Sequence, residues 1–268
     1  MRMRLLRMGE IVLFNSFLFA SFFLVFVFLY FSTPYRYRLV LTLLASYVFY
    51  SSWNPNYLIL IVISSVVAYA AAFRMSQFQE KSERKPYLLF SLAFNLGILL
   101  AFKYGDFFYG QLWRIFDGSG REPILLGMAL PVGISFYTFQ ALSYTIDVYH
   151  GKCPAEKNPI RLAAFIAFFP QLVIGPIERA QNLIPQFYEN HRYDAERAKA
   201  GAILIVKGLF KKMVVADKIA IVILPAYADP ERFSSLSLWV VCFASAVMIY
   251  ADFSGYTDIA RGCASILG

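Results

Sequence analysis

The sequence predicts an all-α fold, a polytopic bundle of transmembrane helices with one broken or re-entrant segment. Hydrophobic residues make up 59% of the 268 residues, and charged residues only 16%. A soluble domain is about half apolar and roughly a quarter charged, so a soluble fold could not bury this much apolar surface. We treat 1–268 as a single transmembrane domain, because a membrane bundle has no separate water-excluded cores to divide it.

The apolar residues fall into runs that are each suited to a helix. These runs are Ile11–Phe31, Leu39–Phe49, Tyr57–Phe73, Tyr87–Phe102, Ile124–Val148, Leu162–Ile177, Ala200–Leu224 and Leu236–Tyr250. Breaks rich in turn-forming or charged residues separate them, at Ser32–Pro34, Asn54–Asn56, Gln77–Pro86, Asp117–Gly120 and Pro225–Arg232. A straight transmembrane helix needs about 20 apolar residues, and the longest of these runs reach that length. The sequence therefore predicts the lipid bilayer as a partner.

The net charge of +8 does not indicate a nucleic-acid partner. The basic residues lie mostly between the apolar runs, where they flank membrane spans, rather than in one patch with exposed aromatic side chains. The three cysteines have no metal-ligand spacing, and the sequence predicts no metal site.

A stripe of polar side chains crosses the run that precedes His150. Tyr137, Gln140, Tyr144 and Asp147 recur at helical spacing on one face. Polar groups at membrane depth are costly and are often functional. The stripe indicates either a helix that faces a polar cavity or acyl tunnel, or interhelical hydrogen bonding that only holds the bundle together.

The next apolar run contains Pro170, Gly175 and Pro176, with Gln171 and Arg179 in the same segment. Proline removes a backbone donor and clashes with the preceding turn, which predicts a broken or re-entrant segment. Non-helical backbone survives at membrane depth only where protein or a water-filled cavity satisfies it. The alternative is a helix merely kinked by proline.

Four lysines lie in or beside one stripe of the run that begins at Ala200. They are Lys207, Lys211, Lys212 and Lys218. Charged side chains cannot remain in hydrocarbon, which favours an interfacial helix with its basic face toward lipid headgroups. The alternative is a cationic rim that attracts the phosphates of an acyl-CoA donor.

The last nineteen residues, YADFSGYTDIARGCASILG, place Asp252, Tyr256 and Asp258 directly after an apolar run. The six-residue separation of the two carboxylates puts them on different sides of a helix, so they do not form an acid–base pair. We expect one of them to pair with a buried cation, and Arg261 lies at the right helical spacing from Asp258.

Common catalytic signatures are absent from the sequence: there is no G-x-S-x-G, no H-E-x-x-H, no Walker loop and no dinucleotide fingerprint. His150 and His191 are the only histidines. Both lie in polar surroundings outside apolar pockets, which predicts solvated surface residues rather than general bases.

Several blocks of this sequence together resemble the membrane-bound O-acyltransferase family, in its bacterial alginate O-acetyltransferase branch. The blocks are VLFNSFLF, SYVFYSSWNPNYLIL, FKYGDFF, LPVGISFYTFQALSYTIDVYHGKCPAEKNP, FFPQLVIGPIERAQNLIPQF, GLFKKMVVADKI and DFSGYTDIARG. Their order and spacing are similar to the family along the whole chain.

The resemblance implies a helical bundle with a tunnel, in the inner membrane of a bacterium. It implies transfer of an acyl group, acetyl in this branch, from acetyl-CoA or another thioester to a polysaccharide such as alginate through extracytoplasmic partner proteins. The candidates for the tunnel are Tyr137, Gln140, Tyr144, Asp147, Pro170, Gln171, Gly175, Pro176, Arg179, Asp252 and Tyr256. Lys207, Lys211, Lys212 and Lys218 are the candidates for donor phosphates or lipid headgroups.

The family's catalytic histidine follows the DFSGY block, in a tryptophan–histidine motif that would lie beyond Gly268. We therefore expect this chain to be a truncated form that is inactive alone, because it would lack the general base for the acceptor hydroxyl. Three alternatives remain open: D-alanyl transfer to teichoic acid in the same family, a membrane transporter with a broken helix, and a non-catalytic scaffold.

Overall fold

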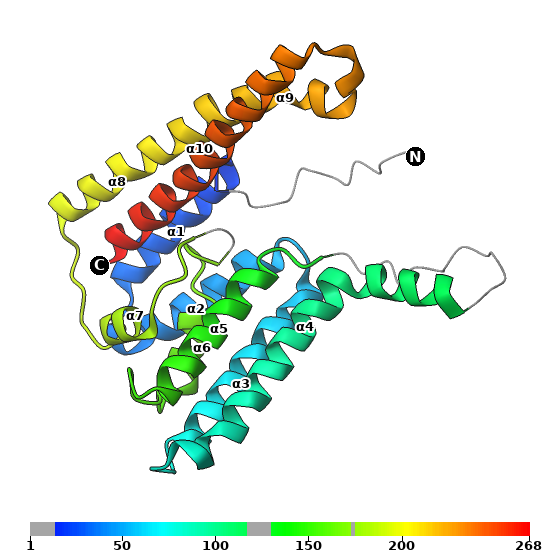
Figure 1. The fold of residues 1–268 in the computed structure, drawn as a ribbon. Helices are drawn as coiled ribbons and strands as arrows, with labels where there is room; N and C mark the ends of the chain where they lie inside the picture. The colour runs from blue at the N-terminus through cyan, green and yellow to red at the C-terminus, as the bar shows by residue number, and fades with distance from the viewer. Residues whose placement is uncertain (1–13, 117–129, 173–174) are drawn as a thin grey trace. The chain divides into compact units, whose positions relative to one another are not determined.

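The computed structural model describes residues 14–116, 130–172 and 175–268, and all regular structure in these ranges is helical (Figure 1). The predicted all-α fold is therefore confirmed. The α-helices are α1 Phe17–Ser32, α2 Tyr35–Ser51, α3 Leu58–Met75, α4 Lys81–Phe116, α5 Ile134–Tyr149, α6 Pro159–Ile166, α7 Ala180–Gln186, α8 Ala195–Leu209, α9 Asp217–Ala228 and α10 Ser235–Leu267. Short 3-10 turns lie at Pro55–Tyr57 and Pro230–Arg232, and a π-helical segment, Phe210–Ala216, joins α8 to α9.

Side-chain caps begin several of these helices. Ser16 accepts a hydrogen bond from the third residue of α1, Asp194 accepts one from α8, and Ser234 accepts one from α10. Asn158 caps α6, whose first residue is Pro159. Short polar side chains satisfy the free amides at a helix start, and proline suits the first helical position.

Two predicted breaks are shorter in the structure than in the sequence analysis. The break predicted at the charged stretch Gln77–Pro86 is too long, because α4 already begins at Lys81 and includes Pro86. Likewise α9 continues through Pro225 to Ala228. Charged residues and proline are both compatible with helix near a membrane surface, where water or neighbouring groups satisfy freed polar atoms.

The predicted break Asp117–Gly120 lies outside the described residues, as do parts of the runs that begin at Ile11, Ile124 and Leu162.

Among the described residues, three helical stretches are long and apolar enough to cross a membrane: Pro55–Met75, Lys81–Trp113 and Ser235–Leu267. Their outer faces carry large apolar side chains. On α10, for example, Trp239 is 65% exposed and Phe243 is 71% exposed. Exposing such apolar faces to lipid tails costs no free energy, whereas exposing them to water is unfavourable. The chain is thus a helical membrane protein.

The chain divides into two compact units. The central unit contains Thr42–Val173 and Ile177–Glu189, and the terminal unit contains Met1–Leu41, Ile174–Pro176 and Asn190–Gly268. The prediction of a single continuous domain stays a prediction.

In the central unit, α3, α4 and α5 pack together (Figure 1) through a chain of buried polar groups. The Ser64 hydroxyl on α3 donates to the side-chain oxygen of Asn95 on α4, and Asn95 donates in turn to the Ser91 carbonyl at 2.9 Å. The Ser91 hydroxyl lies 3.3 Å from that of Thr145 on α5. Hydrogen bonds of this kind hold helices together in a membrane, where apolar side chains gain little from leaving lipid.

In the terminal unit, α8 and α10 run antiparallel and side by side (Figure 1), in contact at paired glycines. A Cβ added at Gly201 would lie 2.7 Å from the Gly262 carbonyl oxygen, and one at Gly208 would lie 2.5 Å from the Gly255 carbonyl oxygen. Small residues allow two membrane helices to approach this closely.

Candidate functional site

The polar stripe of α5 is buried in the central unit. Tyr137, Gln140, Tyr144 and Asp147 are each at most 3% exposed. Their spacing of three and four residues places them on one side of the helix. The stripe therefore faces protein, and its polar atoms must find partners there or in a ligand.

At the C-terminal end of the stripe, two members have identified partners. The Tyr144 hydroxyl accepts a hydrogen bond from the Glu156 backbone amide at 2.9 Å. The Asp147 carboxylate lies 3.4 Å from a guanidinium nitrogen of Arg179, whose side chain is 54% exposed. An arginine paired with a buried carboxylate lowers the cost of burying that charge.

The predicted break near Pro170 is present. Helix α6 ends at Ile166, turns without helical structure follow through Leu172, and α7 begins only at Ala180. The non-helical backbone is buried and satisfied by protein: the Phe169 backbone amide donates to the Ser46 hydroxyl at 3.2 Å, and the Phe165 carbonyl accepts a hydrogen bond from the Gln171 side-chain amide at 3.1 Å. This is the arrangement that irregular backbone needs at membrane depth, and it excludes the alternative of a merely kinked helix.

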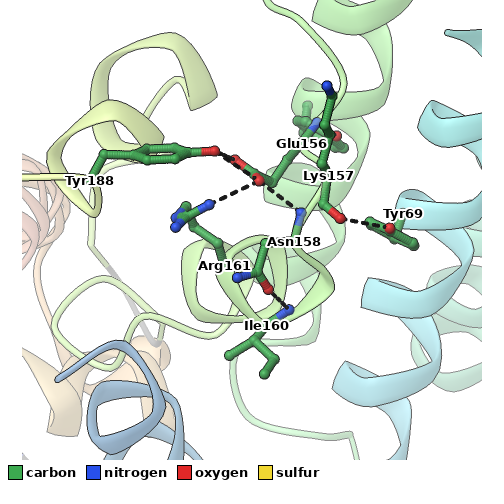
Figure 2. Close-up of polar contacts among 8 residues, drawn as sticks. Tyr69, Glu156, Lys157, Asn158, Ile160, Arg161 and Tyr188 are labelled. Atoms are coloured by element: carbon green, nitrogen blue, oxygen red, sulfur yellow. Dashed lines mark hydrogen bonds and ion pairs between the residues drawn. The ribbon is translucent and has the colours of Figure 1, made fainter. Parts of the chain in front are cut away.

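A buried carboxylate that the sequence analysis did not single out organises the loop between α5 and α6. Glu156 is 6% exposed and accepts hydrogen bonds from the Asn158 amide at 2.8 Å, the Arg161 guanidinium at 3.1 Å and the Tyr188 hydroxyl at 3.1 Å (Figure 2). A buried carboxylate is tolerated only when its oxygens are paired in this way. The signal for it lay in the sequence EKNPIR, in which an acidic residue precedes a helix cap and an arginine.

Further contacts fasten this loop to its neighbours. The Arg161 guanidinium carbon lies 3.5 Å from the centre of the Tyr188 ring, which adds a cation–π contact. On the other side, the Tyr69 hydroxyl of α3 donates to the Lys157 carbonyl at 2.9 Å (Figure 2). The loop thus links α3, α6 and Tyr188, which lies two residues after the end of α7.

Two buried carboxylates consequently hold both ends of α7. Asp147 pairs with Arg179 just before the helix, and Glu156 binds Tyr188 two residues after it. Because α7 has only seven residues, it could not remain helical by itself. These two contacts fix its position against the end of α5.

The Cys153 thiol in this loop is not suited to nucleophilic chemistry. Burial, with a smaller contribution from the Asp147 carboxylate, raises the pKa of the Cys153 thiol to about 11. The thiol therefore stays protonated near neutral pH and is a poor nucleophile. His150 is exposed at the end of α5, as expected from the sequence, whereas His191 is partly buried.

The lysine candidates lie in the terminal unit, where two of them have carboxylate partners on α10. Lys211 lies 2.6 Å from Asp258. Lys212 lies 2.6 Å from Asp252 and 2.9 Å from Asp217. The expected pairing of Asp252 or Asp258 with a cation is therefore confirmed, but the partner of Asp258 is Lys211 rather than Arg261. Both lysines come from the π-helical segment, whose wide turn brings them toward α10.

The sequence candidates thus form two groups, one in each unit. Lys212 also lies 5.3 Å from the ring centre of Tyr256, so Asp252 and Tyr256 belong to the lysine group. Lys207 and Lys218 are exposed. Gly175 and Pro176 lie in non-helical backbone and group with the terminal unit, whereas Pro170, Gln171 and Arg179 accompany the α5 stripe in the central unit.

The chain is similar in sequence to proteins that are described as O-acetylases or O-acetyltransferases. The chain is 35% identical over 260 residues to a protein of Pseudomonas putida described as “probable alginate O-acetylase AlgI”, an alignment that covers 96% of this chain and 53% of the relative. The protein of the same description in Pseudomonas aeruginosa is 36% identical, with 96% and 50% covered. The peptidoglycan O-acetyltransferase of Helicobacter pylori is 34% identical, with 82% and 46% covered.

The chain spans about half the length of these relatives. No protein-family model matches it. The aligned portion nevertheless includes both groups of candidate residues, since it covers nearly the whole chain at more than one-third identity. The chain is therefore a homologue of the alginate O-acetylases and, with them, is related to the membrane-bound O-acyltransferases.

Proposed function

We propose that the chain forms the acyl-conducting portion of a membrane O-acyltransferase that acetylates an exported polysaccharide. Its donor is acetyl-CoA or a similar cytoplasmic thioester, and extracytoplasmic partner proteins pass the acetyl group to an alginate-like acceptor. The protein would lie in the bacterial inner membrane. The observation that carries the proposal is the similarity to alginate O-acetylases over 96% of the chain.

The central unit supplies the polar path in this proposal. The stripe of α5 offers buried hydrogen-bonding groups, and the broken segment beside it replaces a continuous helix with turns around Pro170 and Gln171. Buried polar groups and interrupted helices at membrane depth mark substrate sites in membrane proteins. Asp147 and Glu156 hold this arrangement through Arg179 and Arg161, rather than acting on the acyl group.

The terminal unit has a different role in the proposal. Because Lys211 and Lys212 are paired with carboxylates, we assign them to the packing of α10. The exposed Lys207 and Lys218 remain suited to lipid headgroups or to the phosphates of the donor.

A complementation experiment tests the proposed function, and we expect it to restore O-acetylation of alginate in a strain without its own alginate O-acetylase. The complete protein is expressed in an alginate-producing Pseudomonas strain that lacks its own alginate O-acetylase but keeps the partner proteins. We expect alginate to regain O-acetyl groups, measured by proton NMR of the exported polymer. The Pseudomonas putida protein in the same vector is the positive control.

The similarity to the Helicobacter pylori enzyme favours peptidoglycan as a second acceptor. Muropeptide analysis of the same cells distinguishes the two, because an acetyl group on peptidoglycan changes the mass of the released fragments. If the protein is present in the membrane and neither polymer gains acetyl groups, the proposed function is wrong.

A further inference from the structure

A groove with a largely apolar lining lies in the terminal unit. Its volume is about 430 Å³, within the roughly 300–1,000 Å³ that is usual for ligand sites. One wall comes from the end of the π-helical segment, with Val214 and Val215, and continues along α9 with Ile219 and Val222. The other wall comes from Ala244 of α10, which packs against α9. The groove therefore follows the junction of these two helices.

The form of the groove depends on the π-helical segment. Val215, Ile219 and Val222 recur at spacings of four and three residues, so they share one side of the chain as it enters α9. A π-helical turn is rare in proteins and is frequently found at functional sites. Val222 is 74% exposed, so the groove opens onto an apolar surface of the kind that lipid tails cover.

The groove is charged at one end and apolar along the rest of its length. Lys218 is the one charged side chain in its lining; it is exposed, and no ion pair among the described residues includes it. Beside it, Lys212 is paired with both Asp217 and Asp252, which places a layer of charged groups at this end. In the opposite direction along α9, Val222 continues the apolar lining. Charged groups avoid hydrocarbon, so the charged end fits the membrane–water boundary.

This distribution of charge determines which ligand the groove fits. A lysine at the boundary attracts anionic groups and can extend its apolar stem along hydrocarbon. The apolar lining beyond Lys218 suits a hydrocarbon chain, because contact between the two removes no polar group from water. A phospholipid of net negative charge carries both a phosphate and long chains. Acetyl-CoA does not fit as well, because its acyl group is short and the rest of the molecule is polar.

We infer that this groove binds one anionic phospholipid, with the phosphate at Lys218 and an acyl chain along Val222 and Ala244. The lipid covers apolar surface of α9 and α10 together, and a ligand that binds only the folded protein stabilises it. The inference goes beyond the proposed function and does not depend on it, since the lipid is neither donor nor acceptor of the acyl group.

The test measures lipid binding to the complete protein, purified in a neutral detergent, by native mass spectrometry. The probe is phosphatidylglycerol, and phosphatidylcholine with the same acyl chains is the comparison of zero net charge. We expect the wild-type protein to bind phosphatidylglycerol roughly tenfold more tightly, the effect of one hydrogen bond to a charged group. Lys218→Gln should lose this preference, and Lys218→Arg should keep it.

Two matched controls test the site rather than the surface in general. Lys207 is also an exposed lysine of the terminal unit, but it does not line the groove, so Lys207→Gln should keep the wild-type preference. Ala244→Phe places a ring in the groove and should weaken the binding of both lipids. Ala246→Phe, at an exposed position of α10 outside the lining, should weaken neither. Melting temperatures of the lipid-free variants establish that each is folded, and the Lys218 variants decide the result if Ala244→Phe is not.

Three results would overturn the inference. If Lys218→Gln keeps the wild-type preference, the lysine does not bind the headgroup. An equal loss in Lys207→Gln would mean that the basic surface attracts anionic lipid without a site. Displacement of phosphatidylglycerol by acetyl-CoA would assign the groove to the donor instead. None of these measurements uses acyl transfer, so they remain valid if the proposed function is wrong.

Discussion

Replacing Glu156 by alanine is expected to destabilise the complete protein by about 3–5 kcal/mol, the usual cost of removing one partner from a buried ion pair. The substitution leaves the Arg161 side chain, only 15% exposed, without its carboxylate partner. It also removes the acceptor for the Asn158 amide and the Tyr188 hydroxyl. We expect a large fall in melting temperature and in yield, measured on the purified protein in detergent.

Two comparisons isolate the cause of this effect. Glu189→Ala removes a carboxylate from an exposed position next to Tyr188 and should change stability by less than about 0.5 kcal/mol. Glu156→Gln keeps an acceptor oxygen but loses the charge. Its stability should lie between that of the wild type and that of Glu156→Ala. Equal stability of Glu156→Ala and Glu189→Ala would contradict the role assigned to this carboxylate.

Alanine at Gly208 is expected to separate α8 from α10. The added Cβ would lie 2.5 Å from the Gly255 carbonyl oxygen and 2.9 Å from the Ile259 amide nitrogen, and backbone atoms of a packed helix cannot move aside as a side-chain end can. Overpacking of this kind costs about 1–3 kcal/mol. The measurement is thermal unfolding of the full-length protein, and Gly255→Ala should give a similar loss because it meets the same contact from the other helix.

Gly97 provides the matched control for this prediction. It also lies in a long membrane helix, α4, but a Cβ there meets nothing within 4 Å. Gly97→Ala should therefore be neutral or stabilise the protein by up to about 1 kcal/mol, because alanine favours helix over glycine. If Gly208→Ala is as stable as Gly97→Ala, α8 and α10 do not pack through these glycines.

The sequence was sufficient to predict those features that depend on local patterns. Apolar runs predicted the helices because burial in lipid depends on the composition of a segment. Pro170 predicted the break because proline acts on its own backbone. The three- and four-residue spacing from Tyr137 to Asp147 predicted that these side chains share a face, and the structure places all of them in the interior.

Features that depend on distant pairings could not be predicted in the same way. Glu156 is stabilised by Tyr188, 32 residues away in the sequence. Because the sequence alone does not show that contact, Glu156 resembles an ordinary surface residue there. Asp258 was paired with Arg261 on helical spacing, but its partner Lys211 is 47 residues earlier in the chain. The close approach of α8 and α10 at their facing glycines likewise depends on which two helices pack together, and the sequence of either helix alone does not show this.

The claim that the buried face of α5 conducts the acyl group is tested most directly by one comparison of transfer rates. The complete protein and its partner proteins are placed in membrane vesicles, and transfer of labelled acetyl from acetyl-CoA to polysaccharide is measured for Gln140→Met and Leu142→Met. Both substitutions introduce the same side chain at buried positions of α5, two residues apart. We predict a fall of roughly tenfold or more for Gln140→Met, which loses its polar group, and a rate within about twofold of the wild type for Leu142→Met, a volume-conserving change. Wild-type transfer by Gln140→Met, at equal abundance in the vesicles, would contradict the account.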